Sequence, residues 1–183
     1  MTEEQRQCIE RIQRIEGERV YLRRMTESDT DKIVRWRNMP HVVEHFIYRT
    51  EVTHEDHEKW LVEQVETGRV EQFIIVMREN DREIGSQYFS HIDPINYSAE
   101  FGIFIGEKDA LGQGFGTEVL HLALRYAFEE MKLHEVTLRV LEDNERAIRL
   151  YESCGFKICS ELSREELLDG SRKRIVFMKK GKD

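Results

Sequence analysis

The chain has 183 residues, and its 28 basic and 36 acidic residues give a formal net charge of −8 at neutral pH. This length suits one domain with one core. A nucleic-acid partner is not expected, because such proteins carry a basic patch and the basic residues here are scattered. No apolar run approaches the roughly 20 residues that span a bilayer, and residues 1–16 are too charged for a secretory signal. Three cysteines without paired spacing fit a reducing compartment, so we predict a cytoplasmic protein without a membrane segment.

The first third of the chain predicts one strand and two helices behind a charged preface. Residues 1–17 are weakly amphipathic, and we interpret them as an N-terminal extension, either an added helix or a frayed arm ending at Gly17. The domain itself is predicted over residues 18–183. Its first elements are, in order, a strand over Val20–Arg24, a helix capped at Thr26 and running to about Asn38, and a helix from Thr53 to Gly68.

The remaining two thirds alternate between strand and helix patterns. The predicted elements are, in order, strands over 72–78 and 83–91 that form a hairpin, a strand over 99–105, a helix over 117–131, a strand over 135–141, a helix over 144–154, and strands over 156–162 and 173–178. The helix over 117–131 carries an apolar stripe on one face only, which is typical of a helix packed on a sheet. We therefore predict an α/β fold in which helices cover one mixed sheet.

A glycine-rich turn, Gly112-Gln113-Gly114-Phe115-Gly116-Thr117, precedes the helix over 117–131. Alternating glycines let successive backbone N–H groups approach a ligand, and the helix N-terminus adds about half a positive charge. This pattern predicts an anion cradle, most naturally for phosphate. The alternative is a tight turn selected for its geometry alone.

The spacing of the turn limits which phosphate ligand it fits. A P-loop ends in Gly-Lys-Ser/Thr, and these residues do not follow Gly116, so ATP and GTP are not expected. A dinucleotide fingerprint reads G-x-G-x-x-G directly after the first strand of its unit, whereas this G-x-G-x-G lies in the second half of the chain. Glu142 lies near the place of a ribose-binding acid, so a dinucleotide-binding enzyme stays open as an alternative.

Two segments together carry a family resemblance: IFIGEKDALGQGFGTEVL and, further on, DNERAIRLYESCGF. They resemble the acetyl-CoA core of the GNAT acetyltransferases. The front segment IVRWRNMPHVVEHF and the tail EELLDGSRKRIVFM are similar to the branch that contains ribosomal-protein alanine, spermidine and amino-sugar acetyltransferases. The resemblance covers roughly Arg19 to Lys179. It implies a single-domain fold with a mostly antiparallel sheet, a splay between two central strands and flanking helices.

The resemblance also implies a site for acetyl-CoA. The family motif Gln/Arg-x-x-Gly-x-Gly/Ala maps onto Leu111 to Gly116, where Leu111 replaces the usual polar residue. The expected pyrophosphate cradle comprises Gly112, Gln113, Gly114, Phe115, Gly116 and Thr117. The pantetheine arm is expected to pair with strand backbone at Phe104, Ile105 and Gly106. Asn144 matches a family position that contacts the same arm, and it also suits a helix N-cap.

The chemistry of acetyl transfer requires an acid and a base. The departing thiolate resembles that of cysteine, whose ordinary pKa is about 8.5, so a phenol within hydrogen-bond reach can protonate it. The family pattern Tyr-x-x-x-Gly-Phe is present as Tyr151, Gly155 and Phe156, so we predict Tyr151 as the acid. The alternative is an aromatic residue that fills the core.

The attacking amine arrives protonated, so a base or a water relay must remove its proton. We predict Glu100 as the base, because it is a carboxylate in an otherwise apolar strand beside the expected splay. A glutamate that faces solvent is the alternative. No serine or cysteine is paired with a motif base, so we predict direct transfer without an acyl-enzyme.

The acceptor end is less defined by the sequence. His45, Glu44 and Phe46 are expected in a loop between the first two helices, which lines the acceptor pocket in this family. The histidine pairs at 41/45 and 54/57 lack a third ligand, so no metal is predicted. The predicted partners are a primary amine, carried by a protein N-terminus, a polyamine or an amino sugar, and a second copy of the chain as a homodimer. A non-catalytic acyl-CoA sensor remains an alternative function.

Overall fold

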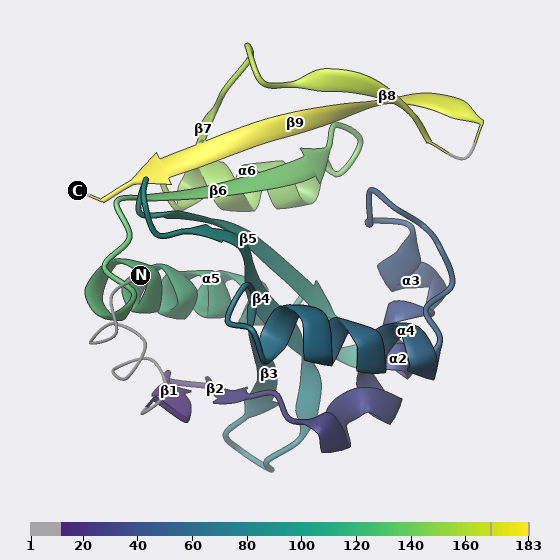
Figure 1. Cartoon of the computed structure of the whole chain (residues 1–183), viewed down its shortest axis with the longest axis vertical. Coiled ribbons are helices and arrows are strands. Elements are labelled where there is room, and N and C mark those ends of the chain that lie inside the picture. Colours follow the sequence, from purple (N-terminus) through teal and green to yellow (C-terminus); the bar gives the residue numbers. More distant parts are fainter. Residues whose placement is uncertain (1–11, 169, 183) are drawn as a thin grey trace.

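The computed structural model describes residues 12–168 and 170–182. These residues form one sheet with helices on both faces (Figure 1). Its elements are, in chain order, β1 (Arg14–Glu16), β2 (Val20–Arg24), η1 (Glu27–Asp29), α2 (Thr30–Arg37), α3 (Pro40–Val43), α4 (His54–Trp60), η2 (Leu61–Val65), β3 (Glu71–Met77), β4 (Glu83–Asp93), β5 (Ser98–Ile105), η3 (Lys108–Ala110), α5 (Phe115–Arg125), η4 (Tyr126–Glu130), β6 (Glu135–Leu141), α6 (Glu145–Ser153), β7 (Lys157–Ile158), β8 (Arg164–Leu168) and β9 (Ser171–Gly181).

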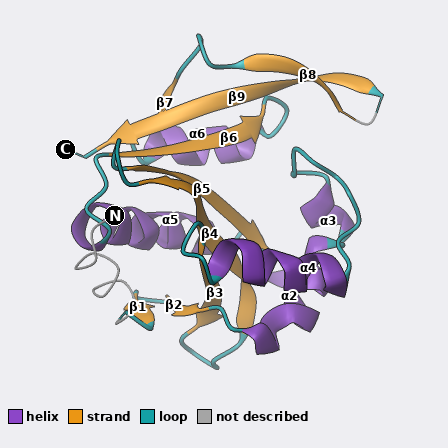
Figure 2. Ribbon diagram, viewed as in Figure 1, coloured by secondary structure: helices purple, strands orange, loops and turns teal. Residues whose placement is uncertain are grey.

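The strand order is β1-β2-β3-β4-β5-β6-β9-β7, with β8 paired to β9. Only β5 and β6 run parallel among the described strands, and they pair over just three residues, Ser98–Glu100 with Glu135–Thr137. Beyond this short ladder the two strands separate (Figure 2). The predicted mostly antiparallel sheet with a splay between two central strands is confirmed.

Alternation along the strands sends side chains to two cores. Leu22, Phe73 and Ile75 face α5, and their neighbours Tyr21 and Ile74 face the layer of α2 and α4. Because side chains of a strand point alternately to its two faces, both faces of this half of the sheet must be covered by helices. Strands β2 and β3 are thereby held between two helical layers.

Three of the predicted helix starts agree with the structure. Thr26 and Thr53 each form a capping box with an aspartate three residues later, and the first turn after Thr26 is a 3-10 turn. Asn144 caps α6 by accepting a hydrogen bond from the N–H of Ala147 at 3.2 Å. Gly68 ends the second helical segment with a positive φ of 71°. Short polar caps were therefore reliable local signals.

Several elements differ from the prediction. Arg14–Glu16 is not a helix end but a strand paired with β2, and the rest of the predicted extension up to residue 11 lies outside the described residues. Pro40–Val43 forms the short helix α3 where we expected only loop. Helix α5 begins at Phe115 rather than Thr117. The strand predicted over 156–162 is reduced to Lys157–Ile158, and β8 was not predicted, because both depend on pairing with β9.

Candidate active site

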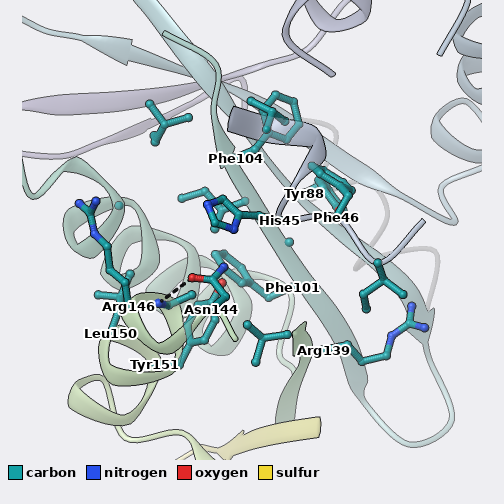
Figure 3. Close-up of a pocket in the computed structure, with 18 of the residues that line it drawn as sticks. His45, Phe46, Tyr88, Phe101, Phe104, Arg139, Asn144, Arg146, Leu150 and Tyr151 are labelled. Atoms are coloured by element: carbon teal, nitrogen blue, oxygen red, sulfur yellow. Dashed lines mark hydrogen bonds between the residues drawn. The ribbon is translucent and has the colours of Figure 1, made fainter. Parts of the chain in front are cut away.

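A cavity of about 580 Å³ opens at the splay. Its lining comes from α2, the segment around α3, strands β4, β5 and β6, the turn before α5, and α6. Figure 3 shows Asn144, Arg146, Leu150 and Tyr151 from α6 on one side of this cavity, with Phe46, Tyr88 and Phe104 on the other. Most of the predicted cofactor residues, together with His45 and Phe46 of the acceptor loop, thus border one continuous space.

Strand β5 presents backbone polar groups to this space in a fixed alternation. The N–H of Gly106 donates to the carbonyl oxygen of Ile84 at 2.8 Å, which marks Gly106 as bonded toward β4. In an antiparallel ladder the backbone groups of every second residue hydrogen-bond to the same neighbouring strand. The N–H and C=O groups of Phe104 therefore also point toward β4. Ile103 and Ile105 then direct their N–H and C=O groups into the splay.

This alternation corrects one expected contact set. Of Phe104, Ile105 and Gly106, only Ile105 aims its backbone at the splay, whereas Phe104 contributes its side chain to the cavity wall. Gly106 does not line the cavity, because the Trp36 indole covers it where a Cβ would stand. Its carbonyl oxygen is also within 3.1 Å of Nε2 of His41. The sequence located the strand but not which residues face the splay.

The glycine turn has the geometry of a backbone cradle. Gly112 and Gly114 take left-handed conformations with φ of 80° and 82°, which favour glycine. Gly114 is the N-cap of α5, so the N–H groups of Phe115 and Gly116 precede the first intrahelical bond. Thr117 is the first residue to bond back, with its N–H 3.2 Å from the carbonyl oxygen of Gly114. All five residues line the cavity, at the positively polarised end of the helix.

Gln113 is the exception in this turn. It lies outside the cavity lining, because its side-chain amide donates to the carbonyl oxygen of Asp109 at 2.6 Å. Its own carbonyl oxygen accepts from the Arg19 guanidinium at 3.0 Å, and that guanidinium stacks 4.4 Å from the centre of the buried Phe115 ring. The Gln113 side chain and the Phe115 ring therefore brace the cradle from behind, and the expected contact of the Gln113 backbone N–H with the ligand stays a prediction.

Arg146 is a cation beside the cradle that the sequence analysis missed. The motif residue that usually contacts pyrophosphate is replaced by Leu111, whose side chain is partly exposed. Arg146, in the first turn of α6, lines the cavity, and its guanidinium lies 3.8 Å from the position of a Cβ on Gly112. A signal was present, because Arg146 follows Asn144 by two residues in the motif that carries the family resemblance.

Tyr151 lies at the inner wall of the cavity on α6. Its ring packs edge-on against Phe101 and tilted against Phe156, with centroid distances of 6.4 and 5.9 Å. Burial, and then the neighbouring Tyr88, raises the pKa of the Tyr151 phenol well above its ordinary value. The hydroxyl is therefore protonated at neutral pH, which is the state that a proton donor requires.

Tyr88 is a second phenol of the cavity that sequence reasoning missed. It lies opposite Gly102 in the β4–β5 ladder, and its ring occupies the place that a Cβ on Gly102 would take. Burial raises its pKa as well, while Arg37 and Arg139 lower it and Glu100 raises it. Arg37, Glu100 and Arg139 belong to three separate elements and line the same cavity as Tyr88.

The Glu100 side chain is only 18% exposed, and Arg139 of β6 holds its carboxylate. Nε of Arg139 lies 2.9 and 3.1 Å from the two carboxylate oxygens, and Nη2 lies 2.9 Å from Oε1. An ionised carboxylate has about four lone-pair directions, and these contacts use two on Oε1 and one on Oε2. Oε2 therefore retains one acceptor direction. It lies 3.7 Å from Nδ1 of His91.

The far end of the cavity is lined by the segment between the first helices. His45 and Phe46 line it as predicted, whereas Glu44 is not part of the lining and its side chain is 61% exposed. Arg37, the last residue of α2, places its guanidinium carbon 3.8 Å from the centre of the Phe46 ring. Sequence patterns had given no reason to single out Arg37 or Arg139.

Two other kinds of site are absent from the described residues. Within residues 12–168 and 170–182, no cluster of three or more His, Cys, Asp or Glu side chains has the arrangement of a metal site. In the same residues, no helix combines the length and apolar character needed to cross a membrane.

The family follows from comparison with known proteins. The family profile of the acetyltransferase (GNAT) domain matches residues 19–157. The chain belongs to the GNAT acetyltransferase family. This membership decides between the acetyltransferase and dinucleotide interpretations of the glycine turn, and the predicted family is confirmed.

The relatives of this chain differ in length and in the activity that their names state. An uncharacterized protein of Methanocaldococcus jannaschii is 32% identical over 145 residues, 78% of this chain, but the match spans only 29% of that protein. The spermidine N(1)-acetyltransferase of Vibrio cholerae is 35% identical over 95 residues, covering 52% of this chain and 54% of that enzyme. Acetyltransferase PseH of Campylobacter jejuni is 27% identical over 140 residues, 75% of this chain and 82% of that protein.

Solved structures show the same fold. The crystal structure of spermidine N-acetyltransferase from Vibrio cholerae in complex with CoA and spermine matches with a TM-score of 0.83 at 24% identity, covering 90% of this chain and 96% of that chain. A dodecameric structure of the Vibrio cholerae enzyme matches with a TM-score of 0.75. The fold class predicted for this chain is thereby confirmed.

Proposed function

We propose that this GNAT protein transfers the acetyl group of acetyl-CoA directly to a primary amine. The observation that carries the proposal is the meeting of three features in one cavity: the backbone cradle before α5, the open edge of β5 at the splay, and the Tyr151 phenol. Family membership and the N-acetyltransferase relatives support the same activity.

The residues present fit acetyl-CoA along its length. The N–H groups of Gly114, Phe115 and Gly116 bind the pyrophosphate, and Arg146 supplies the cation that Leu111 lacks. The backbone of Ile103 and Ile105 pairs with the pantetheine amides inside the splay. Asn144 keeps its side-chain N–H₂ donors, because only its oxygen is used in the helix cap.

The reaction has two proton transfers, for which the cavity offers two groups. Glu100 accepts the proton of the attacking amine on the free lone pair of Oε2, with Arg139 holding the carboxylate in place. The amine nitrogen then attacks the thioester carbonyl carbon. Tyr151 donates its proton to the departing sulfur as negative charge develops there, and the second proton that the nitrogen loses as the amide forms restores the phenol through solvent. No acyl-enzyme is required, because amine and thioester meet in the same space.

The test combines ligand binding with turnover. A thermal-shift comparison of acetyl-CoA, CoA and NAD should show stabilisation by the two CoA forms, since a ligand at 100 times its dissociation constant adds about 2.7 kcal/mol. A panel of amines read by free-thiol release should then show acetylation of at least one class. Binding without release from any amine would indicate a non-catalytic acyl-CoA sensor, and stabilisation by NAD alone would refute the proposal.

Self-association is a separate part of the proposal. A related structure is described as dodecameric, which supports assembly of this chain with its own copies, for which we predict a homodimer. Sedimentation velocity at several concentrations measures the state, and a monomer at all concentrations would contradict the prediction.

A further inference from the structure

The acceptor end of the cavity contains a cation that the described part of the protein does not neutralise. Arg37 lines the cavity, and its Nε is buried without a hydrogen-bond partner. In the described residues its guanidinium forms no hydrogen bond or ion pair, and its contact is the Phe46 ring at 3.8 Å. The aromatic ring contacts the guanidinium but supplies no full negative charge.

The neighbouring titratable groups do not offset this charge. Glu100 is the sole carboxylate among the described residues lining the cavity, and Arg139 already pairs with it. His57, on the adjacent helix, has its pKa lowered by burial and by the charge of Arg37, so it stays neutral at pH 7. The Tyr88 phenol is protonated because burial raises its pKa. The net charge of this end is therefore positive, although the whole chain carries −8.

The acidic side chains that lie just outside the cavity lining form ion pairs with other residues or face solvent. Glu44 is mostly exposed, with its carboxylate 3.6 Å from His45. Asp143 pairs with Lys173 at 2.6 Å. Neither carboxylate lies in the cavity wall, so neither compensates Arg37 inside it.

A half-buried cation without a partner is costly unless an anion arrives to pair with it. A guanidinium offers parallel N–H groups that match a carboxylate or phosphate group in two-point contact. A polyamine, by contrast, brings several positive charges and would find one carboxylate that is already paired. We propose that the acceptor of this enzyme is a small amine that also carries a carboxylate or phosphate group bound by Arg37, and that polyamines are poor acceptors.

This inference rests on the proposed function and names its substrate class. The experiment uses matched pairs of amines that differ only in the anionic group: glucosamine 6-phosphate with glucosamine, and β-alanine with β-alaninamide, with spermidine as a polycation. We expect the anionic member of at least one pair to have a kcat/KM about 10-fold to 100-fold higher than its neutral partner, the usual value of one charge-assisted contact. The two pairs distinguish phosphate from carboxylate.

Variants tie the preference to the named residue. Arg37→Met should reduce the ratio within the preferred pair to about 1 and leave acetyl-CoA affinity unchanged. Arg37→Lys keeps the charge without the two-point contact and should retain part of the preference, and it serves as the test if the methionine variant fails to fold. Arg35→Met is the matched control, because this arginine of the same helix pairs with Glu107 outside the cavity lining. The ratio of kcat/KM between the anionic and the neutral amine should stay the same in this variant as in the parent.

The outcomes separate this inference from the proposed function. Acetylation of spermidine or of the neutral amines at rates equal to or above the anionic ones overturns the inference while the acetyltransferase proposal stands. If no amine releases thiol, the proposed function fails, and calorimetry of the same pairs with the CoA-bound protein decides the inference. Tighter binding of an anionic member that Arg37→Met abolishes supports it, and equal or absent binding refutes it.

Discussion

The cofactor end of the cavity is formed mainly by backbone groups, and the acceptor end by side chains. The cofactor end consists of backbone N–H groups from a continuous run, Gly112 to Thr117, together with one face of the adjacent helix α6. The acceptor end consists of side chains from elements far apart in the chain, among them Arg37, Tyr88, Glu100 and Arg139. A backbone site needs particular conformations, whereas a side-chain site needs particular partners. The backbone site can therefore be recognised from a local sequence motif. The side-chain site forms only when the sheet brings its distant residues together.

The largest effect is expected from breaking the cofactor end at Gly114. Gly114→Val should abolish acetyl-CoA binding, because a β-branched residue resists a φ of 82° and the N–H groups of the cradle would turn away from the ligand. Calorimetry measures the affinity. Gly68→Val is the matched control, since Gly68 has a φ of 71° in open space away from the cavity. Undiminished affinity in a folded Gly114→Val variant would contradict the cradle assignment.

The second largest effect is expected at Tyr151, where the cofactor and acceptor ends of the cavity meet. Tyr151→Phe should lower kcat by about 10²-fold to 10⁴-fold, the range for one positioned proton donor, with little change in acetyl-CoA affinity. The hydroxyl matters only as charge grows on the sulfur, and the packing of the ring on Phe101 and Phe156 is retained. Steady-state kinetics measures the loss. A rate within about threefold of the parent would return Tyr151 to the role of a core aromatic residue.

The smallest of these effects is expected at the acceptor end. Glu100→Gln should lower the rate by about 10²-fold near neutral pH and by less as the pH approaches the pKa of the amine, where solvent removes the proton instead. The pH dependence of kcat/KM measures this convergence. Arg139→Gln is the informative companion, because it frees the carboxylate of its ion pair while leaving the base itself present. A loss in Glu100→Gln that is equal at every pH would indicate that Glu100 positions Arg139 rather than accepting a proton.

The comparison explains how much could be predicted from sequence. Periodicity and caps located α5, α6 and the central strands, and the glycine turn located the cradle, because these signals arise within a few residues. The direction of the backbone groups of Phe104 and Gly106 depends on the register with β4, which local sequence does not reveal. Arg146 had a signal in the motif, whereas Arg37 did not.

Net charge shows the same difference between local and assembled properties. The overall balance of −8 mildly favours a cationic acceptor. Inside the cavity, however, the one lining carboxylate among the described residues is paired, and Arg37 is left unbalanced. The sign of the potential at a site depends on which side chains reach it, and not on the sum over the surface.

The Tyr88 ring fills the space where a side chain at position 102 would begin, which has a practical consequence for redesign of the acceptor end. A combinatorial library that varies position 88 can accept any smaller side chain, since space above Gly102 only increases. A library that varies position 102 collides with the phenol at once, because even an alanine Cβ enters the volume of the ring. The two positions should therefore be randomised in that order, with the aromatic residue shortened before the glycine is replaced.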